Sequence, residues 1–371
     1  MARMAGLCPS HPNRRPVPPG IATETASEPG YESARPRIRC TGSDLPLINQ
    51  RRKRVRVMMQ KRWLFLAGLV LVAAMVAFLV ARAVGGPGPS VLSLDEPNNA
   101  RLPGNFRMIT AGILHPAPGA PLIIPTGLAD LNISGSGQFS QRQLRRMKDE
   151  IDRRRVMVVD LRQESHGFLN GMAVSWVGKH NAANQGLSLP EILRDERRKL
   201  TGLIRADGVK VSRAATNAKV QPLVLHRPLT VCNEAELVRS VGWSYARLPV
   251  TDHQRPSDPV VDQFISLVRG LPADAWLHFH CRAGIGRTTI LMQMYDMMRN
   301  AKQVPFEAII SRQAWLASRS VVHDVQRRMS SRSRGSLEIK DFLQRFYLYC
   351  QSNRDQYRTS WTQWLKMQRQ P

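Results

Sequence analysis

The chain has 371 residues, enough for one large domain or two of ordinary size. It carries 54 lysines and arginines against 28 acidic residues, a formal charge of +26, so we expect polyanionic partners. Charge alone leaves nucleic acid, anionic lipid headgroups and a heavily phosphorylated small molecule as alternatives. Its five cysteines exclude a cysteine metal cluster and a dense disulfide framework by their spacing, although a single bridge between Cys232 and Cys350 stays open.

The N-terminal region predicts where the protein is located relative to the membrane. Residues 1–57 are rich in Pro, Arg, Gly and Ser without apolar periodicity, so we expect them to be disordered. Residues 63–81 carry no charged side chain and approach the roughly 20 residues that cross a bilayer. With the basic residues before it, the segment 63–83 predicts a transmembrane anchor or, since Ala81-Arg82-Ala83 resembles a cleavage site, a signal peptide. Both interpretations place the following domain outside the cytoplasm, periplasmic or secreted.

Two further features complete this region. Met58 and Met59 offer an alternative start of translation, which would leave residues 1–57 untranslated. The basic run before them flanks the apolar segment, so we expect no nucleic-acid partner and membrane contact only through residues 63–83. Residues 84–99 contain a Gly-Pro repeat and are predicted to be a linker, followed by one domain over residues 100–371.

The domain shows regular elements of both kinds. Ser140 and Gln143 have the spacing of a capping box at the start of a helix. Apolar periodicity predicts helices over 141–152, 188–204 and 337–351, a strand over 156–161 and short valine-rich strands within 207–232. The pattern predicts an α/β fold with a small β-rich insert near residues 190–235.

A strand, a tight turn and a helix follow one another around Cys281. Residues 275–279 form an apolar run typical of a buried strand, and a glycine-punctuated turn leads into a helical segment over 288–295. Backbone N–H groups of such a turn, together with the dipole of the following helix, make an anion site. This segment is the predicted active site.

The residue types in the turn specify a chemistry. The helix dipole and the loop amides would stabilise a thiolate at Cys281, which is then a nucleophile for phosphorus. Arg287 can bind two oxygens of a phosphoryl group bidentately, and the Thr288 hydroxyl can hydrogen-bond the sulfur as it leaves. Gly284 and Gly286 are predicted to allow unusual backbone dihedrals and close approach to the anion.

Expulsion of an alkoxide needs a proton, so a general acid is expected opposite the loop. Asp252 is the candidate, because it lies upstream of Cys281 in a turn bounded by Pro249 and Pro256. The arrangement C-x5-R-T with an upstream Asp is typical of cysteine-dependent phosphatases.

Several segments together resemble one family, the bacterial protein-tyrosine-phosphatase-like (PTP-like) phytases. In chain order they are LPGNFR (102–107), SGSGQFS (134–140), VVDLRQESHGFLNG (158–171), TDH (251–253), HCRAGIGRTT (280–289) and RQ (312–313). The resemblance covers about residues 100–350 and implies a phosphatase core, a central sheet flanked by helices, with a small inserted β-barrel domain. It also implies no metal or other cofactor and the stepwise removal of phosphates from myo-inositol hexakisphosphate.

The resemblance assigns roles to residues. Cys281 is the nucleophile, Arg287 the phosphate clamp and Asp252 the acid and base, with Thr288 and His280 in the catalytic group. Substrate contacts are assigned to Arg107, His253 and the loop residues Arg282, Ala283, Gly284, Ile285 and Gly286. Further basic candidates for a polyanion pocket are Arg162, Lys179, Arg312, Arg327, Arg328, Arg332 and Arg334.

The chain departs from the family pattern at Asn181 and over residues 318–336, which affects the expected order of phosphate removal. Two alternatives for the function stay open. One is a phosphatase for phosphotyrosine proteins or phosphoinositide lipids, which would use the same chemistry. The other is a catalytically silent module that binds polyanions.

Overall fold

The computed structural model describes residues 90–109, 124–178, 183–213, 221–227, 229–318 and 334–369, with the single positions Gly68 and Met75. The sheets described below belong to the unit Phe78–Pro371. The predicted disorder over 1–57, the start at Met58 and, apart from those two positions, the apolar segment 63–83 lie outside the described residues. No helix within the described part of the chain is long and apolar enough to cross a membrane.

A five-stranded sheet forms the centre of the domain, in the order β10-β4-β11-β3-β2. Its strands are β2 (Arg107–Met108), β3 (Ile133–Ser136), β4 (Val156–Arg162), β10 (Ser244–Val250) and β11 (Trp276–His280). The four strands β10, β4, β11 and β3 are parallel, and β2 pairs antiparallel with β3 at its edge. The carboxyl ends of parallel strands meet at one edge of a sheet, which is where ligands bind in α/β proteins.

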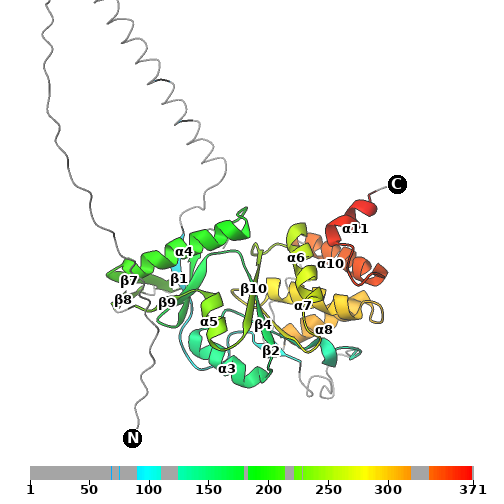
Figure 1. The fold of residues 1–371 in the computed structure, drawn as a ribbon, viewed down its shortest axis with the longest axis horizontal. Coiled ribbons are helices and arrows are strands. Elements are labelled where there is room, and N and C mark those ends of the chain that lie inside the picture. The colour runs from blue at the N-terminus through cyan, green and yellow to red at the C-terminus, as the bar shows by residue number, and fades with distance from the viewer. Residues whose placement is uncertain are drawn as a thin grey trace, which may run out of the picture. The chain divides into compact units, whose positions relative to one another are not determined.

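Helices cover both faces of this sheet, as parallel sheets require. Val156 and Val158 of β4 pack with α3 (Gln141–Ile151) and α5 (Glu234–Ser240). Val159 and Leu161, on the opposite face, pack in a cluster with five helices (Figure 1). These are α6 (Asp258–Arg269), α7 (Gly286–Asn300), α8 (Phe306–Ser318), α10 (Arg334–Ser352) and α11 (Trp361–Met367).

A second, six-stranded sheet has the order β8-β7-β1-β6-β5-β9. Its strands are β1 (Val91–Glu96), β5 (His166–Leu169), β6 (Met172–Val177), β7 (Gly208–Arg213), β8 (Leu223–His226) and β9 (Val231–Cys232). The helix α4 (Leu189–Arg205) packs Leu200 and Leu203 against this sheet (Figure 1). The β-rich part is thus larger than the predicted insert near 190–235, and a barrel is not confirmed.

The strand β1 corrects the predicted linker over 84–99. Residues 91–96 pair antiparallel with β6 and parallel with β7, so this stretch is built into the second sheet. Its apolar residues Leu92 and Leu94 pack against the cluster under α4. The Gly-Pro composition that predicted the linker ends at residue 89, before this strand. The short alternation of apolar and polar residues that follows belongs to β1.

Other local predictions are confirmed. Ser140 and Gln143 form the capping box of α3, and the strand predicted over 156–161 is β4. A second capping box, between Ser188 and Glu191, starts α4. Cys232 and Cys350 are both free thiols, so the disulfide left open between them is not formed.

Candidate active site

The catalytic loop runs from the end of β11 at His280 to the start of α7 at Gly286. Gly284 adopts φ +73°, and a Cβ there would lie 2.2 Å from the backbone nitrogen of Gly137, so only glycine fits. Gly286 starts α7 and does not have a positive φ, so the unusual dihedral predicted for that glycine is not seen, and an added Cβ there would meet open space. The backbone N–H of Gln138 donates to the Arg282 carbonyl at 3.0 Å, which ties the loop to the end of β3.

The Cys281 side chain lies buried at the centre of this loop. Its Sγ accepts hydrogen bonds from the Gly284 backbone N–H and from the Thr288 hydroxyl, both at 3.2 Å. Two hydrogen-bond donors therefore point at one sulfur atom at the N-terminus of α7. The positions of Cys281 and Thr288 are therefore those predicted from the sequence spacing.

The guanidinium of Arg287 is held by the carboxylate of Glu164. Its Nη1 and Nη2 donate to the two Glu164 oxygens at 3.0 and 3.3 Å, and Nη1 also donates to the Val250 carbonyl at 3.2 Å. Burial alone would raise the pKa of Glu164, but the charges of Arg287 and Arg162 outweigh it and hold the pKa well below its usual range. The fork of Arg287 is thus fixed in orientation before any anion binds.

Asp252 follows the end of β10 and reaches the same group. Its Oδ1 lies 3.3 Å from Arg287 Nε, and its side chain is 24% exposed, so a substrate can approach it. The next residue, His253, takes φ +62° and donates its backbone N–H to Asp252 Oδ1 at 3.1 Å. The structure therefore brings the candidate acid beside the phosphate clamp, while the His253 ring is 61% exposed.

Two arginines that were assigned to substrate contact make hydrogen bonds within the protein. Arg107 donates from Nη1 to the Gly284 carbonyl at 2.8 Å and from Nη2 to the Thr289 hydroxyl at 3.0 Å, and burial lowers its pKa to about 10. Arg282 donates from Nε to Asp95 Oδ1 at 2.8 Å. Both guanidinium groups thus have acceptors within the protein.

The additional basic candidates fall into two groups. Arg162 and Arg312 are buried in ion pairs, Arg162 with Asp95 and Glu164, and Arg312 with Asp296, so neither faces a polyanion pocket. Residues whose side chains lie outside the described part are Lys179, Asn181, Arg327, Arg328, Arg332 and Arg334.

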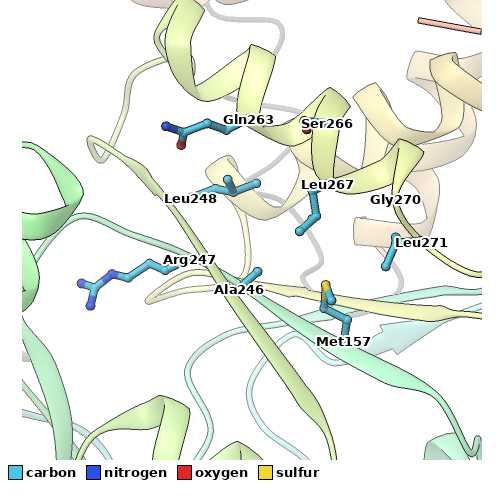
Figure 2. Close-up of a pocket in the computed structure, with 9 residues that line it drawn as sticks. All are labelled: Met157, Ala246, Arg247, Leu248, Gln263, Ser266, Leu267, Gly270 and Leu271. Atoms are coloured by element: carbon cyan, nitrogen blue, oxygen red, sulfur yellow. The ribbon is translucent and has the colours of Figure 1, made fainter. Parts of the chain in front are cut away.

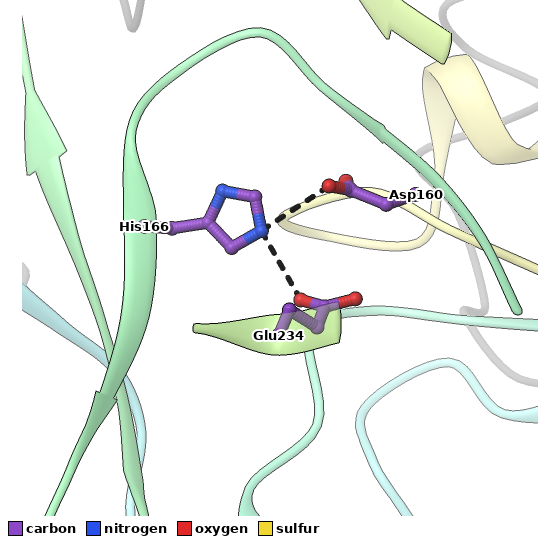
Figure 3. A group of neighbouring side chains, drawn as sticks. All are labelled: Asp160, His166 and Glu234. Atoms are coloured by element: carbon purple, nitrogen blue, oxygen red, sulfur yellow. Dashed lines mark hydrogen bonds and ion pairs between the residues drawn. The ribbon is translucent and has the colours of Figure 1, made fainter. Parts of the chain in front are cut away.

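His280 belongs to a buried network that sequence inspection missed. Its Nε2 lies 2.6 Å from Glu234 Oε1, and the other oxygen of Glu234 lies 3.1 Å from His166 Nε2. His166 also lies 3.3 Å from Asp160 Oδ2 (Figure 3). Burial alone would lower the pKa of His166, but the charge of Asp160 outweighs it and raises the pKa to about 10. The polar run DLRQESH at the end of β4 was the available signal.

Asp160, His166 and Glu234 are close enough together to be tested as a metal site, although the sequence spacing predicted none. Protein groups already supply the positive charge: Arg247 Nε lies 3.2 Å from Asp160 Oδ2, and the protonated His166 pairs with both carboxylates. The Tyr245 hydroxyl donates to the same Asp160 oxygen at 2.7 Å. A cation here would have to displace these partners, so the residues do not fit a resident metal.

A cavity of about 480 Å³ lies elsewhere, between β10 and α6 (Figure 2). It is lined by Met157, Ala246, Arg247, Leu248, Gln263, Ser266, Leu267, Gly270 and Leu271. None of these residues belongs to the catalytic loop, and Figure 2 shows the Arg247 side chain pointing away from α6. The catalytic loop therefore lies outside this cavity.

The parallel sheet, the strand-loop-helix around Cys281 and the clamped Arg287 define an α/β protein with the anion loop of cysteine phosphatases. The PTP-like phytase family model, described by the words inositol hexakisphosphate, matches residues 159–299. A PTP-like phytase structure from Bdellovibrio bacteriovorus is 32% identical with a TM-score of 0.59, covering 76% of this chain and 96% of that one. The chain belongs to the PTP-like phytase family.

Two longer proteins are also similar. The PTP-like myo-inositol phosphatase of Mitsuokella multacida, solved with myo-inositol-(1,3,4,5)-tetrakisphosphate, is 33% identical with a TM-score of 0.67, covering 76% of this chain and 48% of that one. The effector protein hopD2 of Pseudomonas syringae pv. tomato is 34% identical over 251 residues, 66% of this chain and 53% of the effector. The chain thus spans about half the length of these two relatives.

Proposed function

We propose that this protein is a cysteine-dependent phosphomonoesterase that hydrolyses myo-inositol hexakisphosphate and lower inositol polyphosphates through a phosphocysteine intermediate. The observation that supports it most is the convergence on one loop of the Cys281 sulfur with two donors, the clamped Arg287 and Asp252 at 3.3 Å from that clamp. Family membership supports the substrate class.

In the first step the Cys281 thiolate attacks phosphorus, and the bond from phosphorus to the inositol oxygen breaks. The transferring phosphoryl group is bound by loop N–H groups and by Arg287, whose guanidinium is already oriented by Glu164, and these donors stabilise its charge. Protonated Asp252 gives its proton to the leaving alkoxide, which needs one because it is a strong base. For this, a substrate phosphate takes over the interaction of Arg287 Nε that Asp252 makes in the structure.

In the second step water attacks phosphorus and the bond from sulfur to phosphorus breaks. Asp252, now ionised, accepts the proton of the water, and inorganic phosphate leaves. The Thr288 hydroxyl, 3.2 Å from Cys281 Sγ, donates to the sulfur as negative charge returns to it. The enzyme is regenerated without a cofactor.

The positive charge of the chain favours a polyanionic small molecule as substrate. A formal charge of +26 raises the local concentration of an ester that carries several phosphates. We propose in addition that the domain acts outside the cytoplasm, on the basis of the apolar segment 63–83. A reporter fused at residue 90 that stays cytoplasmic and soluble would overturn this location.

The test is hydrolysis of inositol hexakisphosphate by the full chain, with the inositol phosphate products resolved over time. A phosphotyrosine peptide and a phosphoinositide are compared as substrates. Cys281→Ser is expected to abolish turnover while leaving anion binding largely intact, since a serine hydroxyl does not ionise there. A large preference for the peptide or the lipid would overturn the substrate assignment, and turnover by the serine variant would overturn the mechanism.

A further inference from the structure

A line of alternating charges connects the two arginines of the catalytic loop. Arg282 Nε lies 2.8 Å from Asp95 Oδ1, and Asp95 Oδ2 lies 2.9 Å from Arg162 Nη1. Arg162 Nε then lies 2.9 Å from Glu164 Oε1, and Glu164 Oε2 lies 3.0 Å from Arg287 Nη1. Apart from Arg282, these side chains are at most 1% exposed, so water screens the contacts little.

Asp95 is the one member of this line that comes from the second sheet. Its neighbours Leu94 and Glu96 pair with Val174 and Ala173, which are adjacent in β6, so Asp95 is the extra residue of a β-bulge. Bulges next to active sites re-aim a side chain. Here the bulge presents Asp95 to the two arginines, and Ser175 donates its hydroxyl to Asp95 Oδ1 at 2.9 Å.

We propose that Asp95 is a positioning residue of the catalytic loop, and this inference rests on the proposed function. It forms an ion pair with Arg282 directly. It also forms an ion pair with Arg162, so that Glu164 stays available to hold Arg287 in place. Without the Asp95 charge, Arg162 has Glu164 as its remaining carboxylate partner within 4 Å among the described ion pairs, and it competes with Arg287 for that group. The strand β1 thereby makes the geometry of the anion site depend on the second sheet.

The experiment measures the affinity of the full chain for tungstate, an inert tetrahedral oxyanion, through its protection of Cys281 from alkylation by iodoacetate. Asp95→Asn is expected to weaken tungstate binding about tenfold or more, because removal of one partner of a buried ion pair leaves the other uncompensated. Glu96, the neighbour of Asp95 in β1, accepts a hydrogen bond from Gln143 Nε2 at 2.7 Å and lies outside the line of charges. Glu96→Gln is therefore the matched control, and its tungstate affinity should match that of the wild type.

Arg282→Lys supplies a second variant, and because Arg282 is 23% exposed we expect this variant to fold. It keeps the positive charge but loses the planar Nε donor that meets Asp95. If Asp95 acts through Arg282, this variant also weakens tungstate binding, and the double variant with Asp95→Asn loses less than the product of the two single losses. Thermal unfolding is followed in parallel, since a purely structural role would lower the midpoint without changing the tungstate affinity of the folded protein.

Unchanged tungstate affinity in Asp95→Asn, or in Arg282→Lys if the first variant does not fold, would overturn the proposal. So would strictly multiplicative losses in the double variant. Because tungstate binding and alkylation require no hydrolysis, failure of the wild type on inositol hexakisphosphate would count against the proposed function and leave this inference standing.

Discussion

Replacement of Glu164 by glutamine tests how the phosphate clamp is held. The carboxylate is fully buried and contacts Arg287 at 3.0 and 3.3 Å and Arg162 at 2.9 Å. Neutralising one partner of a buried ion pair costs about 3–5 kcal/mol. We expect the lower end, about 3 kcal/mol, because Arg162 keeps Asp95 and Arg287 keeps the Val250 carbonyl.

The loss has a defined pH dependence. The pKa of Glu164 is lower in the folded protein than in the unfolded chain, so its contribution to stability is fully present above the ordinary carboxyl range, about 4.3. It is lost as the pH falls below that value through the folded pKa. The difference between wild type and Glu164→Gln should therefore be constant from pH 6 to 8 and shrink below about pH 4.

Urea denaturation at several pH values measures this difference, and kcat/KM with inositol hexakisphosphate measures the clamp. A mispositioned Arg287 is expected to lower kcat/KM about 10²–10³-fold, the range found when a transition-state donor is removed. Glu150→Gln is the control, because its ion pair with Arg146 is exposed and should contribute at most about 0.5 kcal/mol. If Glu164→Gln is no less stable than the control variant and retains full activity, the clamp does not depend on Glu164.

Three further predictions follow from the site. Asp252→Asn should lower kcat on inositol hexakisphosphate about 10²–10⁴-fold. It should slow phosphoenzyme formation from p-nitrophenyl phosphate less, because a phenolate leaves without a proton. Rapid-quench kinetics measure this step, and an equal loss of rate with both substrates would show that Asp252 is not the general acid. Activity should survive EDTA, since the cluster around Asp160 already has cationic protein partners, and loss restored by zinc would contradict this. The pKa of His166 is raised to about 10, so its contribution to stability is full below about 6.5 and is lost as the pH rises through 10. Urea titrations should show this decline in the wild type and a flatter profile in His166→Gln; identical profiles would refute it.

Much of the reactive centre could be predicted from the sequence, because its residues lie close together along the chain. Cys281, Gly284, Arg287 and Thr288 lie within one strand-loop-helix unit, and backbone geometry converts their spacing directly into a loop around an anion. The capping box at Ser140 is local in the same sense. Asp252 was found through its turn chemistry, although its distance from Arg287 follows from the parallel pairing of β10, β4 and β11.

The tertiary structure decided what holds that centre in place. Asp95 comes from β1, Glu164 from the connection between β4 and β5, and Glu234 from α5, and their convergence depends on strand register and on one bulge in β1. The sequence could equally not predict which acceptors the side chains of Arg107, Arg162 and Arg282 contact. An arginine side chain reaches many acceptors, and burial selects the one whose charge or carbonyl replaces the lost water.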